Sequence, residues 1–293
     1  MIASWKFALV AIGGLLLCSC AGKSELQQPA QNFYNAASAL AAAEPKMLTD
    51  VNGAAASLTR SEQQLKYISD KEDFTIDAPK PIVAPADYNA RVDAVNAVQL
   101  YAQAILNLTG SAPDQNIDTY SESLAKNLQT GVPNRWSGLQ APDAQGLAAA
   151  LSALTQLVID QKAYSSVVDI AAKAQPSVIK LAGLIAADNA LLTNEVQSLG
   201  RVSSVSRMQL LRIIRSDKRI LKNTLSDDFS NLAAASDVSV TLKEITVISN
   251  LAQSLVTANA VLAKGDTPTF AALAQDAYRR GADAYSVFQS SKK

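Results

Sequence analysis

The sequence predicts an all-α protein, an elongated antiparallel bundle of about six to eight helices with no sheet. Apolar residues recur at three- and four-residue spacing through most of the chain after residue 32, which is the period of an amphipathic helix. Only 5% of the residues are aromatic and 18% are charged, a composition that suits closely packed, alanine-rich helices. Val238, Val240 and Leu242 alternate as in a strand, but the longer helical stripe from Val238 to Leu262 favours a helix because of its length.

The first predicted helix follows an apolar stripe that begins at Phe33 and continues to Ile68. It is expected to cover residues 32–70. Pro45 lacks a backbone N–H, so we expect either one bent helix or two collinear helices at that point.

Proline-rich and glycine-rich segments divide the next part of the chain. Residues 74–86 contain three prolines and predict an extended connector on the surface. Asp87 is expected to cap a second long helix that stops at Gly110. A short helix is then expected over 117–129, followed by a loop at 131–142.

Prolines also mark the predicted helices in the middle of the chain. Pro142 suits the first position of a helix that is expected to end near Lys173. Pro176 is expected to restart the pattern, which continues to Leu199. Asp188 falls within this apolar stripe, so it is either a buried polar residue or a point where the stripe meets water.

Two alternatives remain open after Gly200. Ser206 and Gln209 match a capping box, which favours a new helix from Arg207. The other alternative is one continuous helix from Ser177 to Leu225, about 75 Å long.

The last two helices are separated by a short turn. Gly265 is expected to close the helix that begins near Val238, and Thr267 with Pro268 is expected to cap and start the final helix. That helix should end in a frayed tail at residues 290–293.

The composition excludes several kinds of site. The chain contains no histidine, so a Ser-His-Asp or Cys-His mechanism is excluded, as is a histidine-based zinc site. Both cysteines lie within the first 20 residues, which leaves none for a disulfide in the body. The 26 basic and 26 acidic residues cancel, so nothing argues for nucleic acid. We expect no metal and no cofactor.

The first 20 residues have the pattern of an export signal. Lys6 precedes an uncharged apolar segment over residues 7–17, too short to span a bilayer. Leu17-Cys18-Ser19-Cys20 then resembles the lipobox of bacterial lipoproteins, which directs lipidation of the final cysteine and cleavage just before it. The resemblance implies that residues 1–19 are removed and that Cys20 becomes the acylated first residue. The alternative is an ordinary secretory signal cut near Ala21 or Gly22.

The same resemblance implies a location. A lipidated Cys20 would hold the protein on the outer face of a membrane, with residues 20–31 as a polar, flexible tether and residues 32–293 as one helical domain. Because Ala21 rather than aspartate follows the cysteine, the resemblance implies the outer membrane, facing the periplasm, if the organism is Gram-negative.

Two surface features are candidates for binding. The first is a cationic helix face that is expected to meet an anionic partner, such as lipid head groups, peptidoglycan or an acidic protein; the alternative is a solvated face paired to acids on neighbouring helices. Its residues are Arg201, Arg207, Arg212, Arg215, Lys218, Arg219 and Lys222. The second is the loop that contains Arg135 and Trp136, an interface composition, although the tryptophan could equally fold back onto the bundle end.

Three classes of function remain. The favoured one is a lipid-anchored envelope protein with a structural or protein-interaction role. The competing one is a carrier of an apolar ligand or lipid, which would require an apolar interhelical pocket larger than about 300 Å³. An enzyme that works without histidine is the least favoured.

Overall fold

The computed structural model describes residues 5–68, 80–109, 149–150, 153, 156–157, 166–216 and 238–290, with the side chains of most of them from Glu25 onward. Its long helices are α1 (Trp5–Ile68), α2 (Pro85–Leu108), α5 (Val167–Ser216), α7 (Ser239–Leu262) and α8 (Thr267–Ser290). These described residues contain no strand, and the stretch that begins at Ser239 is helical. The all-α prediction is therefore confirmed.

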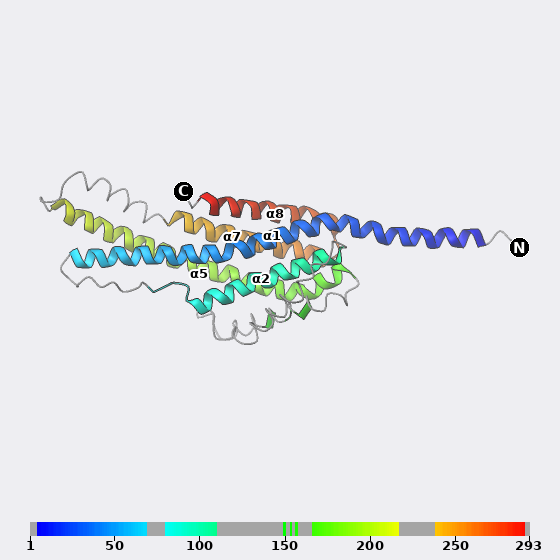
Figure 1. Ribbon diagram of the computed structural model, residues 1–293, viewed down its shortest axis with the longest axis horizontal. Coiled ribbons are helices and arrows are strands. Elements are labelled where there is room, and N and C mark those ends of the chain that lie inside the picture. Colours follow the sequence, from blue (N-terminus) through cyan, green and yellow to red (C-terminus); the bar gives the residue numbers. More distant parts are fainter. Residues whose placement is uncertain are drawn as a thin grey trace.

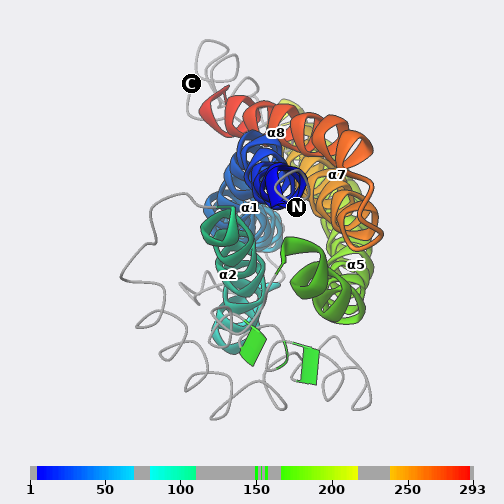
Figure 2. The same cartoon turned by 90° about the vertical axis from the view of Figure 1, so that its right-hand side faces the viewer.

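Helix α1 is the centre of the bundle. It contacts α2, α5, α7 and α8, whereas α2 and α8 lie on opposite sides of it (Figure 2). The helices lie lengthwise beside one another and form an elongated body (Figure 1). Helices α1, α5 and α8 run in one direction and α2 and α7 in the other, so the α1–α2, α5–α7 and α7–α8 pairs are antiparallel (Figure 1).

Small residues allow α8 to approach the central helix closely. Ala36 and Ala37 of α1 are buried, and Ala39 packs against the same core. On α8, a Cβ added to Gly281 would lie only 2.9 Å from the Cβ of Ala39. The α1–α8 contact therefore depends on the absence of a side chain at Gly281.

Pro45 does not split α1. The helix continues through Pro29 and Pro45, and Figure 1 shows a single, gently bent ribbon. The Thr49 hydroxyl donates a 2.9 Å hydrogen bond to the Pro45 carbonyl, and the Tyr88 hydroxyl of α2 reaches the same oxygen at 3.4 Å. Of the two expected forms, the bent helix is the one observed, because packing on several sides outweighs the local effect of proline.

The expected flexible tether at residues 20–31 is also wrong, because these residues belong to α1. Pro29 and Ala30 are buried, and the Asn32 amide donates a 2.8 Å hydrogen bond to Gln275 of α8. The polar composition suggested a solvated segment, and Gln27 and Gln28 are exposed, but Leu26 packs against the core and Ala30 lies within it.

The connector before α2 is non-helical where the structure describes it, with a bend at residues 82–83 and an extended backbone at Ala84. The Asn52 side chain donates to the Val83 carbonyl at 3.0 Å and accepts from the Val83 N–H at 2.8 Å, which holds the connector against α1. Helix α2 begins at Pro85 with Ala84 as its N-cap, so the connector ends before residue 86 and the expected Asp87 cap is wrong. Asp87 instead lies in the first helical turn.

Helix α2 ends at Leu108, with Thr109 as its C-cap, close to the expected stop at Gly110. The elements expected after this helix cannot be compared with the structure. Gly110, the short helix at 117–129 and the loop at 131–142 lie outside the described residues.

Helix α5 is continuous through Gly200 and Arg207, as in the second of the two alternatives, whereas the expected end at Leu225 lies outside the described residues. It starts at Val167, where the Asp169 N–H donates to the Ser166 hydroxyl at 3.1 Å. It then passes through Pro176 and Gly200, so the expected end near Lys173 and restart at Pro176 are wrong. Gly200 faces α7, and a Cβ there would lie 3.0 Å from a methyl group of Val238.

The turn between α7 and α8 matches the expectation in part. Gly265 has a φ of 75°, a left-handed conformation that suits glycine at the end of a helix. The cap of α8 is Asp266 rather than Thr267, because the Asp266 carboxylate accepts from the Thr269 N–H at 3.2 Å. Thr267 is the first helical residue.

Two of these helices are long and apolar enough to cross a membrane by length and composition alone, Val167–Gln209 and Ser239–Leu262. In the bundle, about half of the most apolar stretch of each is buried. Helix α7 also buries the polar side chains of Glu244 and Asn259. Core helices of globular proteins share these properties.

Candidate functional site

The predicted cationic face is not continuous along α5. Arg201 and Arg212 are exposed, whereas Arg207 is only 5% exposed and belongs to the interior. The Arg215 side chain, Lys218, Arg219 and Lys222 lie outside the described residues. Counting all the cations as one face was therefore wrong at Arg207.

Two other predicted features are not tested by the structure. Arg135 and Trp136 lie outside the described residues. Cys20 lies within the helical span of α1, but its side chain is outside the description.

The main group of ionisable side chains in the core lies where α1, α2 and α5 meet. This charge cluster consists of Glu44 from α1, Arg91 from α2 and Asp188 from α5, all buried. Arg91 Nη2 lies 2.5 Å from Asp188 Oδ1, which makes a buried, charge-assisted hydrogen bond. Asp188 is therefore the buried polar residue of the two alternatives raised for it.

Glu44 is the member of the charge cluster whose protonation is most affected. Burial raises its pKa from 4.5 to about 8; Arg91 opposes this shift and Asp188 adds to it. Its Oε2 atom is buried and makes no hydrogen bond. Near neutral pH the Glu44 carboxyl is therefore mainly protonated, and Arg91 with Asp188 forms the ion pair.

The burial of Glu44 and Arg91 was not predicted from the sequence, because charged side chains are usually exposed. Yet Glu44 lies four residues after Leu40 and four before Leu48, both buried, and it therefore shares their face of α1. Arg91 lies four residues before the buried Val95 in the same way. The spacing of these apolar residues was therefore the signal that could have revealed both buried charges.

A half-buried lysine, Lys46, makes charged contacts on the opposite side of α1. Lys46 follows Glu44 by two positions, so the two side chains point roughly 200° apart around the helix. Its Nζ lies 2.9 Å from Asp50, 3.9 Å from the fully buried Glu244 of α7 and 4.7 Å from the centre of the Phe288 ring of α8. Charged contacts thus join α1 to neighbours on both sides.

A third polar group links α2, α5 and α7. The buried Tyr101 hydroxyl donates to Asn259, whose amide donates to Gln175 at 2.5 Å. Burial holds the pKa of Tyr101 well above its usual range, so this hydroxyl stays protonated and acts as a donor. Phe33 contacts Tyr101 edge-on and also packs against Phe270. Hydrogen bonds of this kind fix which helix faces meet.

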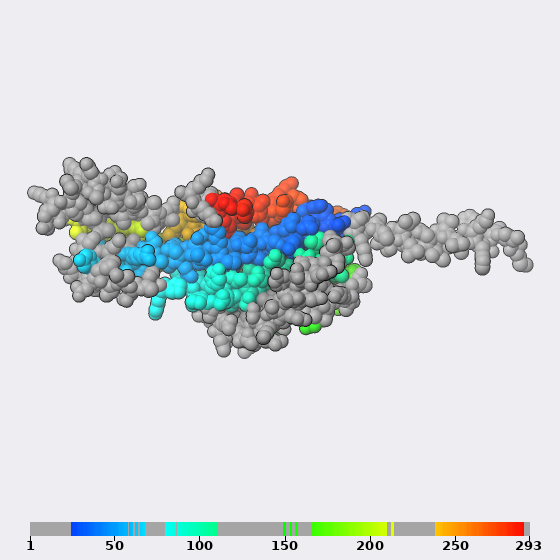
Figure 3. Space-filling model, in the orientation of Figure 1, coloured from blue at the N-terminus to red at the C-terminus, as the bar shows by residue number. Residues whose placement is uncertain are grey.

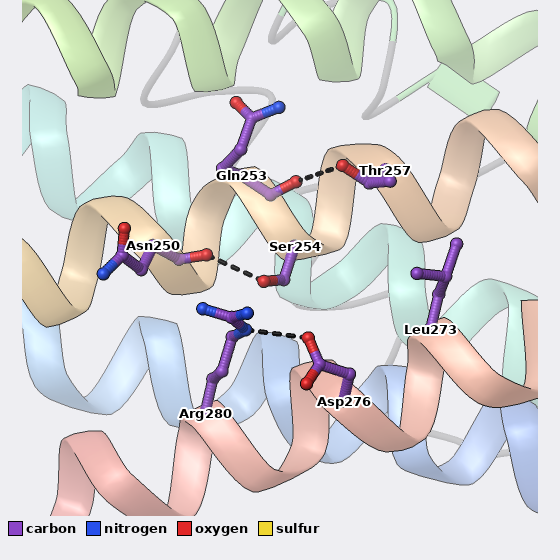
Figure 4. A pocket seen from close by; sticks show the side chains of 7 residues that line it. All are labelled: Asn250, Gln253, Ser254, Thr257, Leu273, Asp276 and Arg280. Carbon is purple, nitrogen blue, oxygen red and sulfur yellow. Dashed lines mark hydrogen bonds and ion pairs between the residues drawn. The ribbon is translucent and has the colours of Figure 1, made fainter.

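A shallow groove lies between α7 and α8 on the outside of the bundle (Figure 4). Its volume is about 270 Å³. It is lined by Asn250, Gln253, Ser254, Thr257, Leu273, Asp276 and Arg280. Arg280 binds Asp276 at 2.8 Å, while the Ser254 and Thr257 hydroxyls bond to backbone carbonyls of α7. Six of the seven side chains are polar, and the volume is below the roughly 300 Å³ expected of a lipid carrier's pocket.

These observations define the class of the protein: an all-α bundle built around one central helix, with charged and hydrogen-bonded side chains buried between the helices. Within the described part of the chain, no three acidic, cysteine or histidine side chains are grouped as metal ligands. No protein-family model, curated protein or solved structure matches the chain.

Proposed function

We propose that this protein is a lipid-anchored rod of the bacterial cell envelope with a structural or protein-interaction role. The observation that carries the proposal is the continuity of α1, which contains Cys20 and is also the helix that contacts all four of its long neighbours. A lipid on Cys20 would therefore be joined directly to the centre of the bundle.

The first described side chains of α1 support this arrangement. Only residues 21–24 separate Cys20 from Glu25, and Leu26 already packs against the core. The Asn32–Gln275 hydrogen bond ties the same end of α1 to α8. A lipid at Cys20 would hold the bundle by one end, and Ile68 at the other end of α1 would lie roughly 70 Å away along the helix.

The packing favours a scaffold over a carrier. Tyr101, Phe33 and Phe270 are fully buried, and Phe33 contacts each of the other two rings. The groove between α7 and α8 is open to solvent, and its volume of about 270 Å³ is below the roughly 300 Å³ expected of a ligand pocket. The expected partners are another envelope protein, peptidoglycan or anionic lipid, at the outer membrane facing the periplasm in a Gram-negative cell.

Fatty-acid labelling tests the anchor, with the neighbouring cysteine as a matched control. The natural chain and Cys18→Ser should incorporate labelled palmitate and sediment with membranes. Cys20→Ser should lose both the label and the membrane attachment, or should accumulate uncleaved. Label that persists in Cys20→Ser, or its absence from the natural chain, would overturn the proposal.

A further inference from the structure

The far end of α5 has an unusual distribution of side chains. From Val196 to Ser216 the sequence contains four arginines and no acidic residue. Val202, Val205 and Met208 are 45%, 59% and 59% exposed. Ser203 and Ser206 are buried instead. This part of α5 therefore turns three apolar side chains outward and two serines inward.

The exposed cations lie on the same side of α5 as these apolar residues. At 100° per residue, Arg201, Val205, Met208 and Arg212 fall within an arc of about 60°, and Val202 lies about 60° beyond it. We name these five residues the basic-apolar tip. Aliphatic side chains flanked by arginines are the composition of a helix that lies on an anionic membrane surface.

Neighbouring helices add positive charge at this end of the bundle. The last turns of α1, which reach the same end of the bundle as the far end of α5 (Figure 1), expose Arg60, Lys66 and Tyr67 and leave Glu62 partly exposed. Figure 3 shows the side chains of α1 reaching this end, away from the N-terminus. At the start of α7, which contacts α5 through Val238 and Gly200, Val240 and Lys243 are exposed while Glu244 is buried.

We infer that the basic-apolar tip docks on a lipid bilayer that contains anionic head groups. The arginines would contact phosphates, and the three aliphatic side chains would enter the boundary between head groups and acyl chains. The inference rests on the proposed anchor at Cys20, which lies at the opposite end of α1. The protein would then connect two lipid surfaces about 70 Å or more apart.

A vesicle-capture experiment tests this with the full lipidated chain. Donor vesicles of phosphatidylcholine, with a trace of biotinylated lipid, carry the protein through its anchor. Protein-free fluorescent acceptor vesicles contain phosphatidylcholine alone or with about one-third phosphatidylglycerol. The donors are collected on streptavidin beads, and both the protein and the acceptor fluorescence on the beads are measured.

Capture should occur only with acidic acceptors and should weaken as salt is raised, because salt screens exposed charges. The triple variant Val202→Ser, Val205→Ser, Met208→Ser and the double variant Arg201→Glu, Arg212→Glu should each reduce capture by roughly tenfold or more. Two control variants should capture acceptors as the natural chain does. They are Ile179→Ser with Leu191→Ser, exposed apolar residues elsewhere on α5, and Arg279→Glu, an exposed cation of α8.

Three results would overturn the inference: equal capture of neutral acceptors, unchanged capture by both tip variants, or, in a parallel assay with protein-loaded acceptors, capture only when the acceptors also carry the protein. The last result would indicate contact between two copies. Protein missing from the donor vesicles would contradict the anchor instead, so the two failures are distinguishable. Circular dichroism of each variant confirms that it remains folded.

Discussion

The middle of the bundle and the far end of α5 arrange the same residue types in opposite ways. At the charge cluster, Glu44, Arg91 and Asp188 are buried among apolar side chains. At the basic-apolar tip, Val205 and Met208 are exposed while Ser206 is buried. The difference teaches that in this chain the residue type does not decide burial. What decides it is whether other helices cover that face of the helix.

The largest effect is expected from breaking the charge cluster. Arg91→Met would leave Asp188 buried without its 2.5 Å partner, and the loss of one member of a buried pair costs about 3–5 kcal/mol of unfolding free energy. Urea denaturation followed by circular dichroism measures this. Arg279→Met on the exposed face of α8 should change stability by no more than about 0.5 kcal/mol. A similar small effect for Arg91→Met would contradict the buried pair.

The second prediction concerns pH. Because the pKa of Glu44 is about 8 in the folded protein and 4.5 without the fold, the folded state holds this proton more tightly. Its contribution to stability is complete below pH 4.5 and is lost as pH rises toward 8, by at most about 1.4 kcal/mol per pH unit. Glu44→Gln should remove this loss and be more stable than the natural chain at alkaline pH.

The control for that titration is Glu195→Gln, an exposed carboxylate on α5. Unfolding free energies of the natural chain and both variants are compared at several pH values between 5 and 9. Parallel curves for the natural chain and Glu44→Gln would show that Glu44 does not take up a proton on folding.

The third prediction tests how closely α8 packs on α1. Gly281→Ala would place a Cβ 2.9 Å from that of Ala39, so the helices would have to separate, at a cost of about 1–3 kcal/mol. Gly183→Ala on α5 meets nothing within 4 Å and should stabilise its helix by about 0.5–1 kcal/mol. Thermal unfolding measures the melting temperature of both variants. A change of melting temperature with the same sign in both would contradict the close α1–α8 contact.

The smallest effect on stability is expected at the basic-apolar tip. Val202→Ser, Val205→Ser and Met208→Ser remove exposed side chains, so each should change the unfolding free energy by no more than about 0.5 kcal/mol. The matched buried change, Val196→Ser, should cost several times more. Tip variants that destabilise as strongly as Val196→Ser would show that these side chains are packed, and the contrast with the charge cluster would disappear.

Much of the fold follows from local pattern. The stripes from Phe33 and from Val178 predicted helices because helical periodicity places every third or fourth residue on one face. Gly265 predicted a turn because glycine accepts a left-handed conformation without a steric penalty. Asp188 was recognised as unusual because it lies in a stripe. Such signals depend on the residue and its near neighbours alone.

Other features were decided only by the tertiary structure. Pro45 and Pro176 lie inside continuous helices because contacts along both sides outweigh the local cost of a missing N–H. Arg207 is buried while Met208 beside it is exposed, because periodicity shows which residues share a face and not which face another helix covers. Glu44 acquires its altered pKa for the same reason, since the burial that shifts it is created only when α1, α2 and α5 come together.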